Sequence, residues 1–141
     1  MKRWLAMAAF AGPLLLSAAL GARIAGVGPV WSTVVYAAAG LVCHQRPDRS
    51  FFTSGVQWPV CGRCAGLYIA APLGVIAAFV LRRAWRDDRV RVWLALAALP
   101  TAVSWAAEHL LGMPQTNAVR AALALPLGAA VAFLLVRVAP E

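Results

Sequence analysis

All three cysteines of this 141-residue chain lie in one polar interval, together with one of its two histidines. Cys61 and Cys64 have the C-x-x-C spacing, which presents two sulfur atoms to one tetrahedral metal ion. Cys43 and His44 would complete a Cys3His ligand set. Neighbouring residues on a helix point about 100° apart, so His44 can also face elsewhere, and His109 is then the alternative fourth ligand. The expected metal is zinc, because thiolate and imidazole are its preferred ligands.

The same cysteines allow two other interpretations. C-x-x-C is also the spacing of thiol–disulfide exchange, with Cys61 and Cys64 as the exchanging pair and Cys43 as a third thiol that relays or resolves. Nearby guanidinium groups would lower the thiol pKa and raise reactivity, namely those of Arg46, Arg49 and Arg63. A structural disulfide between Cys61 and Cys64, or between Cys43 and Cys64, is the third interpretation. Spacing alone does not separate the three.

A second set of polar residues lies within or next to the apolar runs, and we expect it at the same membrane depth as the cysteines. It comprises Ser104, Glu108, His109, Asn117 and Arg120. Ionisable groups near a membrane span are costly unless they are paired or line a cavity, so they are candidates for function. Glu108 and Arg120 are natural partners across two helices, although both could instead extend to water. Glu108, Arg49 and Arg120 are the candidate catalytic residues, with Glu108 as a base beside an open metal position. Asn117 is expected to cap the last helix.

The elements that must position these residues are membrane helices. The chain is 62% hydrophobic and 13% charged, far from the composition of a soluble domain. Four apolar runs are each long enough to cross a bilayer as a helix, at residues 4–22, 65–81, 92–109 and 119–136. Lys2 and Arg3 before the first run would also suit a signal peptide, but we interpret that run as a retained helix. The prediction is an all-α, polytopic four-helix membrane bundle in one integral domain.

The intervals between these runs predict the topology. Residues 23–64 form the outer loop, with a short interfacial helix over 29–43 before the Cys/His segment. The hairpin 82–91 contains five arginines, so it is predicted to be cytoplasmic. Both termini then lie in the cytoplasm, and the cysteines lie at the extracytoplasmic face.

The distribution of charge and the spacing of small residues indicate which partners the chain can bind. The net charge is +8, but the arginines gather at the ends of apolar runs, which indicates topology and lipid headgroups rather than nucleic acid. The lipid bilayer is therefore the expected partner. Small residues recur every four positions in two runs, a spacing that lets helix backbones approach closely, at Gly66, Ala70 and Gly74 and at Ala124, Gly128 and Ala132. These faces could pack within the chain, form a homo-oligomer or bind another membrane protein.

The motifs Cys43-His44-Gln45, Arg49-Ser50-Phe51 and Pro59-Val60-Cys61-x-Arg63-Cys64-x-Gly66-x-Tyr68 resemble one bacterial and archaeal family of small membrane proteins, domain of unknown function 2085. Pro100, Asn117, Arg120 and Gly128 continue the resemblance. Where the family usually has an aspartate, this chain has Ser104. The resemblance implies the plasma membrane of a prokaryote and a Cys/His/Arg cluster that acts as a unit, and it implies no reaction.

Three function classes follow. The first is a multi-pass membrane protein with a Cys/His zinc site at its extracytoplasmic face. The second is a membrane thiol–disulfide oxidoreductase, and the third is a small transporter or subunit of a membrane complex. A Walker loop, a nucleotide fingerprint and an H-E-x-x-H motif are all missing from the sequence. Neither a nucleotide-dependent enzyme nor a common zinc hydrolase is therefore indicated.

Overall fold

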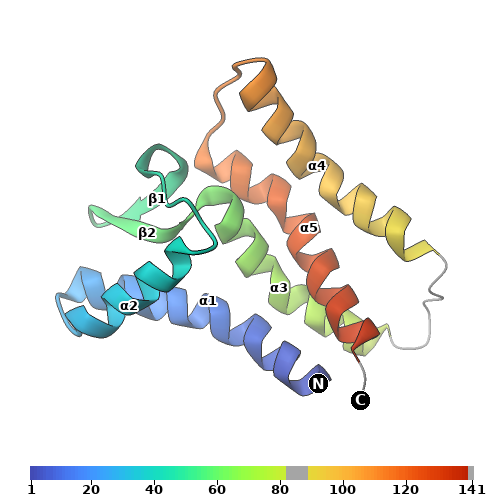
Figure 1. The fold of residues 1–141 in the computed structure, drawn as a ribbon, viewed down its shortest axis with the longest axis horizontal. Helices are drawn as coiled ribbons and strands as arrows, with labels where there is room; N and C mark the ends of the chain where they lie inside the picture. The colour runs from blue at the N-terminus through green and yellow to red at the C-terminus, as the bar shows by residue number, and fades with distance from the viewer. Residues whose placement is uncertain (82–88, 140–141) are drawn as a thin grey trace.

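The computed structural model describes residues 1–81 and 89–139. Within these ranges the chain forms five α-helices and one antiparallel pair of strands (Figure 1). The helices are α1 (Lys2–Ala25), α2 (Pro29–Gly40), α3 (Gly62–Val80), α4 (Val90–Leu110) and α5 (Asn117–Val138). A single 3-10 turn, Pro47–Arg49, precedes the strands β1 (Ser50–Thr53) and β2 (Val56–Cys61).

Four of the described helices, α1, α3, α4 and α5, are long and apolar enough to cross a membrane. They correspond to the four predicted spans, and the all-α membrane-bundle prediction is confirmed. The short helix α2 has 12 residues, a length of about 18 Å at 1.5 Å per residue, which is too short to span. It begins at Pro29 as predicted and ends at Gly40, three residues before Cys43. The predicted hairpin 82–91 lies mostly outside the described residues.

The outer loop contains a β-hairpin that was not predicted from the sequence. Thr53 pairs with Val56 across a two-residue turn, and the turn residues Ser54 and Gly55 have φ angles of 51° and 76°. Two positive φ angles match the backbone twist of the flanking strands and form the commonest tight hairpin turn. The hairpin returns the chain to Cys61 at the start of α3, so it determines where the C-x-x-C pair lies.

The helices α3 and α5 lie side by side in the middle of the bundle, with α1 and α2 on one side and α4 on the other (Figure 1). The first turn of α1 and the last turn of α5 lie near one another. We call the opposite end, formed by the hairpin, the first turns of α3 and α5 and the last turn of α4, the loop end. It contains both groups of chemically active residues.

The predicted small-residue faces hold α3 against α5. A Cβ atom added at Gly66 would lie 2.1 Å from the carbonyl oxygen of Ala121, and one at Gly74 would lie 2.1 Å from that of Ala129. On α5, a Cβ at Gly128 would lie 2.5 Å from a carbonyl oxygen of α3. The two predicted faces therefore contact each other within the chain.

This packing predicts a large effect of a single methyl group. Gly66→Ala is expected to destabilise the protein by about 1–3 kcal/mol, because overpacking must separate two backbones. Gly21→Ala is the matched control, since it also lies in a helix and an added Cβ there meets nothing within 4 Å. Unfolding by sodium dodecyl sulfate in mixed micelles measures both. Equal stabilities for the two variants would contradict the close contact of α3 with α5.

Candidate functional site

The three cysteines come together at the loop end from three different elements. Cys43 follows α2, Cys61 ends β2 and Cys64 lies in the first turn of α3. Their sulfur atoms all lie within 4.8 Å of one another, and all three are free thiols, with Cys43 and Cys61 buried. Sulfur ligands of a tetrahedral zinc ion are about 3.8 Å apart for Zn–S bonds of about 2.3 Å. Small side-chain movements would therefore suffice for all three sulfurs to bind one ion.

Main-chain hydrogen bonds hold this group in place. The backbone N–H of Cys61 donates to the sulfur of Cys43 at 3.1 Å. The side-chain amide of Gln45 donates to the carbonyl oxygens of Tyr36 and Pro59, each at 2.7 Å, and so ties α2 to β2. Gln45 itself has a φ of 46°, which places it in the left-handed region that non-glycine residues rarely adopt. The chain thereby turns sharply after Cys43.

No role was predicted for Gln45, nor for Gln57, whose side-chain amide donates to the Gln45 carbonyl oxygen at 2.6 Å. Both glutamines lie among polar residues. The sequence does not distinguish a side-chain amide that hydrogen-bonds to backbone groups from one that is solvated. The positive φ of Gln45 leaves no signal in a single sequence either. Their positioning role is visible only once the hairpin is built.

The electrostatics of Cys61 favour the thiolate. A hydrogen bond with the Cys64 side chain lowers the pKa of Cys61 to about 5, and the Cys64 backbone N–H and the Cys43 side chain act in the same direction, while burial opposes them. The neighbouring arginines, which were expected to lower this pKa, are not its cause, so that expectation was wrong. Their guanidinium groups are directed at other partners: Arg46 at Asp48, Arg49 at His109 and Arg63 at Glu108.

The two histidines lie outside the group of three sulfurs. His44 is exposed, and its Nδ1 lies 3.4 Å from the backbone N of Arg46. His109 stacks on Trp105, with ring centroids 4.6 Å apart. Its Nδ1 lies 2.9 Å from the Trp105 carbonyl oxygen, and its Nε2 lies 3.4 Å from the Arg49 guanidinium. Both ring nitrogens of His109 are thus engaged.

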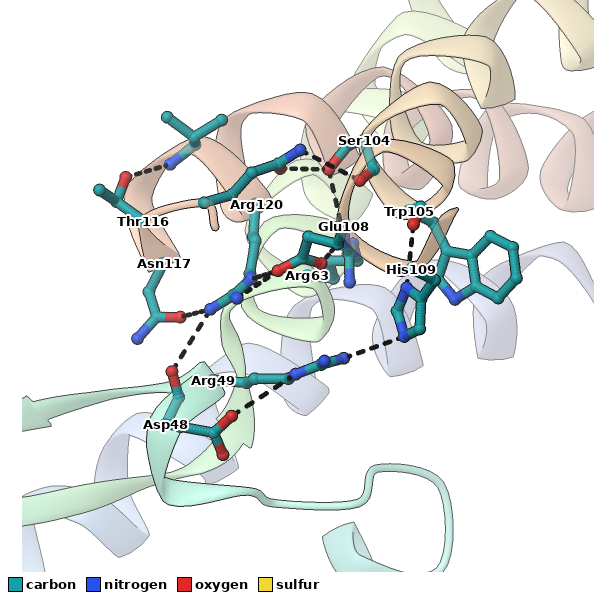
Figure 2. A network of polar contacts seen from close by, with 12 residues as sticks. Asp48, Arg49, Arg63, Ser104, Trp105, Glu108, His109, Thr116, Asn117 and Arg120 are labelled. Carbon is teal, nitrogen blue, oxygen red and sulfur yellow. Dashed lines mark hydrogen bonds and ion pairs between the residues drawn. The ribbon is translucent and has the colours of Figure 1, made fainter. Parts of the chain in front are cut away.

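The second group is an ion-pair network that joins three helices (Figure 2). Glu108 on α4, whose side chain is 5% exposed, accepts hydrogen bonds from Arg63 on α3 and from Arg120 on α5. The Arg120 Nε–H donates to it at 2.7 Å. The predicted partnership of Glu108 with Arg120 is confirmed. Arg63 is a third member that the sequence analysis did not place here, because its position between two cysteines suggested a role towards sulfur.

The same network anchors the outer loop to α5. Arg120 donates to the Asp48 carbonyl oxygen at 3.3 Å and to the Asn117 side-chain oxygen at 2.6 Å. The Asn117 amide donates to the Ser50 carbonyl oxygen at 2.8 Å. Asn117 therefore holds the loop, and the predicted capping role was wrong, since Thr116 caps α5 by accepting from the backbone N–H of Val119 at 3.3 Å.

Ser104 is buried behind the network at 2% exposure. Its hydroxyl accepts from Arg63 at 3.1 Å and donates to the side-chain oxygen of Gln115 at 2.6 Å. The Gln115 amide returns a hydrogen bond to the Ser104 carbonyl oxygen at 3.0 Å. The serine is thus fully engaged as a neutral group, and the only acidic side chain that contacts Arg63 in the described part of the chain is that of Glu108.

The matched family model is described as Predicted membrane protein (DUF2085), and it covers residues 43–134, which include both groups. An uncharacterised protein of Methanocaldococcus jannaschii is 37% identical over 73 residues, 51% of this chain and 47% of that protein, so the match spans about half of that relative's length. An uncharacterised protein of Methanothermobacter thermautotrophicus is 30% identical over 93 residues, 66% of this chain and 83% of that protein. No solved structure matches the chain.

Proposed function

Because the chain belongs to the DUF2085 family of predicted membrane proteins, we propose that it is a multi-pass membrane protein that binds one zinc ion through its three cysteines. The single observation that carries the proposal is the convergence of three sulfur atoms, from the segment after α2, from β2 and from α3, within 4.8 Å. Thiolates from separate elements at this separation suit a soft, tetrahedral ion. Zinc analysis of protein purified without chelator, expected to give one ion per chain, is the test.

Two further features support a metal centre. A ligating thiolate must lose its proton, and the hydrogen bond from Cys64 lowers the pKa of Cys61 to about 5, which prepares this one of the three thiols to bind an ion. Metal ligands are also held by neighbouring hydrogen-bond donors, and the backbone N–H of Cys61 supplies one to the sulfur of Cys43.

The fourth ligand in this proposal is His44, or else a water molecule. His44 is adjacent to Cys43, and its side chain is exposed. His109 is the weaker candidate of the two, because its ring nitrogens already face Trp105 and Arg49. A closed site of this kind is structural. It would fasten the outer loop to the start of α3.

In this proposal the former catalytic candidates serve as counter-ions. Glu108 accepts from two guanidinium groups, one at each carboxylate oxygen, so both oxygens are engaged in ion pairs. Arg120 and Arg49 would stabilise the loop end through Glu108, Asp48 and His109. Both groups, and the five helices of the described residues, would then belong to one integral membrane domain.

The thiol–disulfide oxidoreductase is retained as the second candidate on one observation. A thiol whose pKa lies near 5, beside a half-buried partner thiol, also suits disulfide exchange. The two candidates differ in what they require of Cys43, since a tetrahedral site needs it as a ligand and a Cys61–Cys64 disulfide forms without it.

The topology belongs to the same proposal. We place the protein in the plasma membrane with both termini in the cytoplasm and the thiols outside, because the arginine-rich segment 82–91 should remain inside. The proximity of the first turn of α1 and the last turn of α5 (Figure 1) supports an even number of spans.

Labelling with a membrane-impermeant thiol reagent measures this topology in a variant without the native cysteines. A cysteine introduced at Ser54 in the hairpin turn, or at Met113 between α4 and α5, is expected to react in intact cells, since both positions are exposed. One introduced at Asp88, outside the described residues, is expected to react only after lysis. Labelling at Asp88 in intact cells, without labelling at the other two positions, would reverse the orientation.

A further inference from the structure

The loop end contains more positive than negative charge among the described residues. Arg46, Arg49, Arg63 and Arg120 face only two carboxylates, and each carboxylate is shared by two guanidinium groups. Glu108 forms ion pairs with Arg63 and Arg120, and Asp48 forms ion pairs with Arg46 and Arg49. Outside the group of three thiols, these four cations and two anions leave an excess of two positive charges.

This excess charge is largely withdrawn from water. The side chains of Arg49, Arg63 and Arg120 are only 20%, 15% and 10% exposed. Buried charges are costly unless they are paired, so an excess at this depth needs a counter-ion. Among the described residues no further acidic side chain is available at the loop end to provide one.

Two N–H groups of the inner arginines also have no hydrogen-bond acceptor in the described structure. The Nε atoms of Arg49 and Arg63 are buried and have no hydrogen-bond partner in the described structure, and the closest carboxylate oxygen to the Arg49 Nε is that of Asp48 at 3.7 Å, beyond a hydrogen bond. Buried donors without partners are rare in native proteins and often indicate a missing ligand or ion.

Arg49 lies at the more exposed edge of the cluster. Figure 2 shows the Arg49 side chain lying beside the Glu108 network, between Asp48 and His109. Arg49 is the most exposed of the three inner arginines, and His109 beside it is exposed as well. A ligand would therefore approach Arg49 first, with the charges of Arg63 and Arg120 behind it.

We propose that this edge binds a phosphate group, with Arg49 as the principal contact. A phosphate monoester carries about −1.5 to −2 charge at neutral pH, which matches the excess of two positive charges. Its oxygens accept paired hydrogen bonds from a guanidinium group better than from an ammonium group. The phosphate can belong to the headgroup of phosphatidic acid or to inorganic phosphate. The site does not involve the thiols, so it holds whether or not they bind a metal.

The test uses the full chain in nanodiscs of neutral phosphatidylcholine. In one arm, calorimetry measures the binding of inorganic phosphate. In the other, the discs contain phosphatidic acid, and native mass spectrometry counts the phosphatidic acid retained by each released protein. Saturable binding near one per chain is expected in at least one arm, and the arm in which it occurs identifies the source of the phosphate.

The decisive variant is Arg49→Gln, which leaves the bonds of Glu108 to Arg63 and Arg120 in place. It is expected to weaken binding about ten- to a hundred-fold, the range for losing charge-assisted hydrogen bonds. Arg49→Lys keeps the positive charge, so its affinity for the phosphate ligand should lie between those of Arg49→Gln and the wild type. The matched control is Arg23→Gln, which removes the same charge from the end of α1, where Arg23 instead contacts Tyr36 and Thr33.

Folding is verified for each variant by its circular dichroism and melting temperature in the same discs. No saturable binding of either ligand by the wild type would overturn the proposal. An equal loss of affinity in Arg23→Gln and Arg49→Gln would also overturn it, because binding would then follow surface charge rather than this site.

Discussion

Replacing Cys43 with serine is expected to lower the zinc affinity of the protein by about a hundred-fold or more, because even the loss of an outer-shell partner costs about 10–100-fold and Cys43 is a proposed ligand. The sulfur of Cys43 lies within 4.8 Å of those of Cys61 and Cys64, and a serine hydroxyl is a poor substitute for thiolate. Competition with a calibrated chelator measures the affinity, and elemental analysis measures the zinc retained.

The histidines supply a matched pair of controls. His44→Ala is expected to weaken zinc binding by about ten-fold or more if it fills the fourth position, in the range of lost ligand support. His109→Ala should leave zinc affinity unchanged, because that imidazole is directed at Trp105 and Arg49. Loss of zinc in His109→Ala alone would replace His44 with His109 in the proposed ligand set.

The same Cys43→Ser variant separates metal binding from redox chemistry. If the thiols bind zinc, they stay reduced, and mass-tagging of denatured protein should label all three cysteines of the wild type after the metal is removed. If the C-x-x-C pair is an exchanging dithiol, a Cys61–Cys64 disulfide should be recovered from both the wild type and Cys43→Ser. Wild-type protein without zinc and with that disulfide would overturn the metal proposal.

The helices could be predicted from sequence because a membrane helix is specified by one local property, an apolar run of sufficient length. The third predicted span, 92–109, and the helix Val90–Leu110 differ by only two residues at one end and one at the other. The small-residue faces could also be identified, since a four-residue spacing is local. Which helix each face contacts depends on the tertiary arrangement, and Gly66 against Ala121 is a contact that no spacing shows.

The outer loop was harder to predict for a different reason. Its hairpin has four- and six-residue strands around Ser54 and Gly55, a weak turn signal. The proximity of Cys43 to Cys61 then depends on the hairpin and on the turn at Gln45 together. Residue type alone indicated that the cysteines act as a group, but the direction of Arg63 could not be predicted, because a long side chain between two cysteines can reach either the thiols or the next helix.

Removing the shared carboxylate is expected to have the largest effect on stability in the ion-pair network. Glu108→Gln should destabilise the protein by about 3–5 kcal/mol, the range for breaking a buried ion pair and leaving charge uncompensated. Two guanidinium groups, those of Arg63 and Arg120, lose their only shared carboxylate partner in the described structure. Unfolding in mixed micelles measures the change. Arg46→Gln is the control, since its pair with Asp48 is exposed on both sides and is worth about 0–1 kcal/mol.

A double-mutant cycle tests whether this cost arises from the pair itself. Glu108→Gln combined with Arg120→Gln should be less destabilising than the sum of the two single changes, by about 1 kcal/mol or more, because groups in direct contact do not act additively. Arg120 also holds the loop through Asp48 and Asn117, so part of its effect will remain in the double variant. Strictly additive effects would mean that the two charges are solvated separately, and the network would then not be what joins α4 to α5 at the loop end.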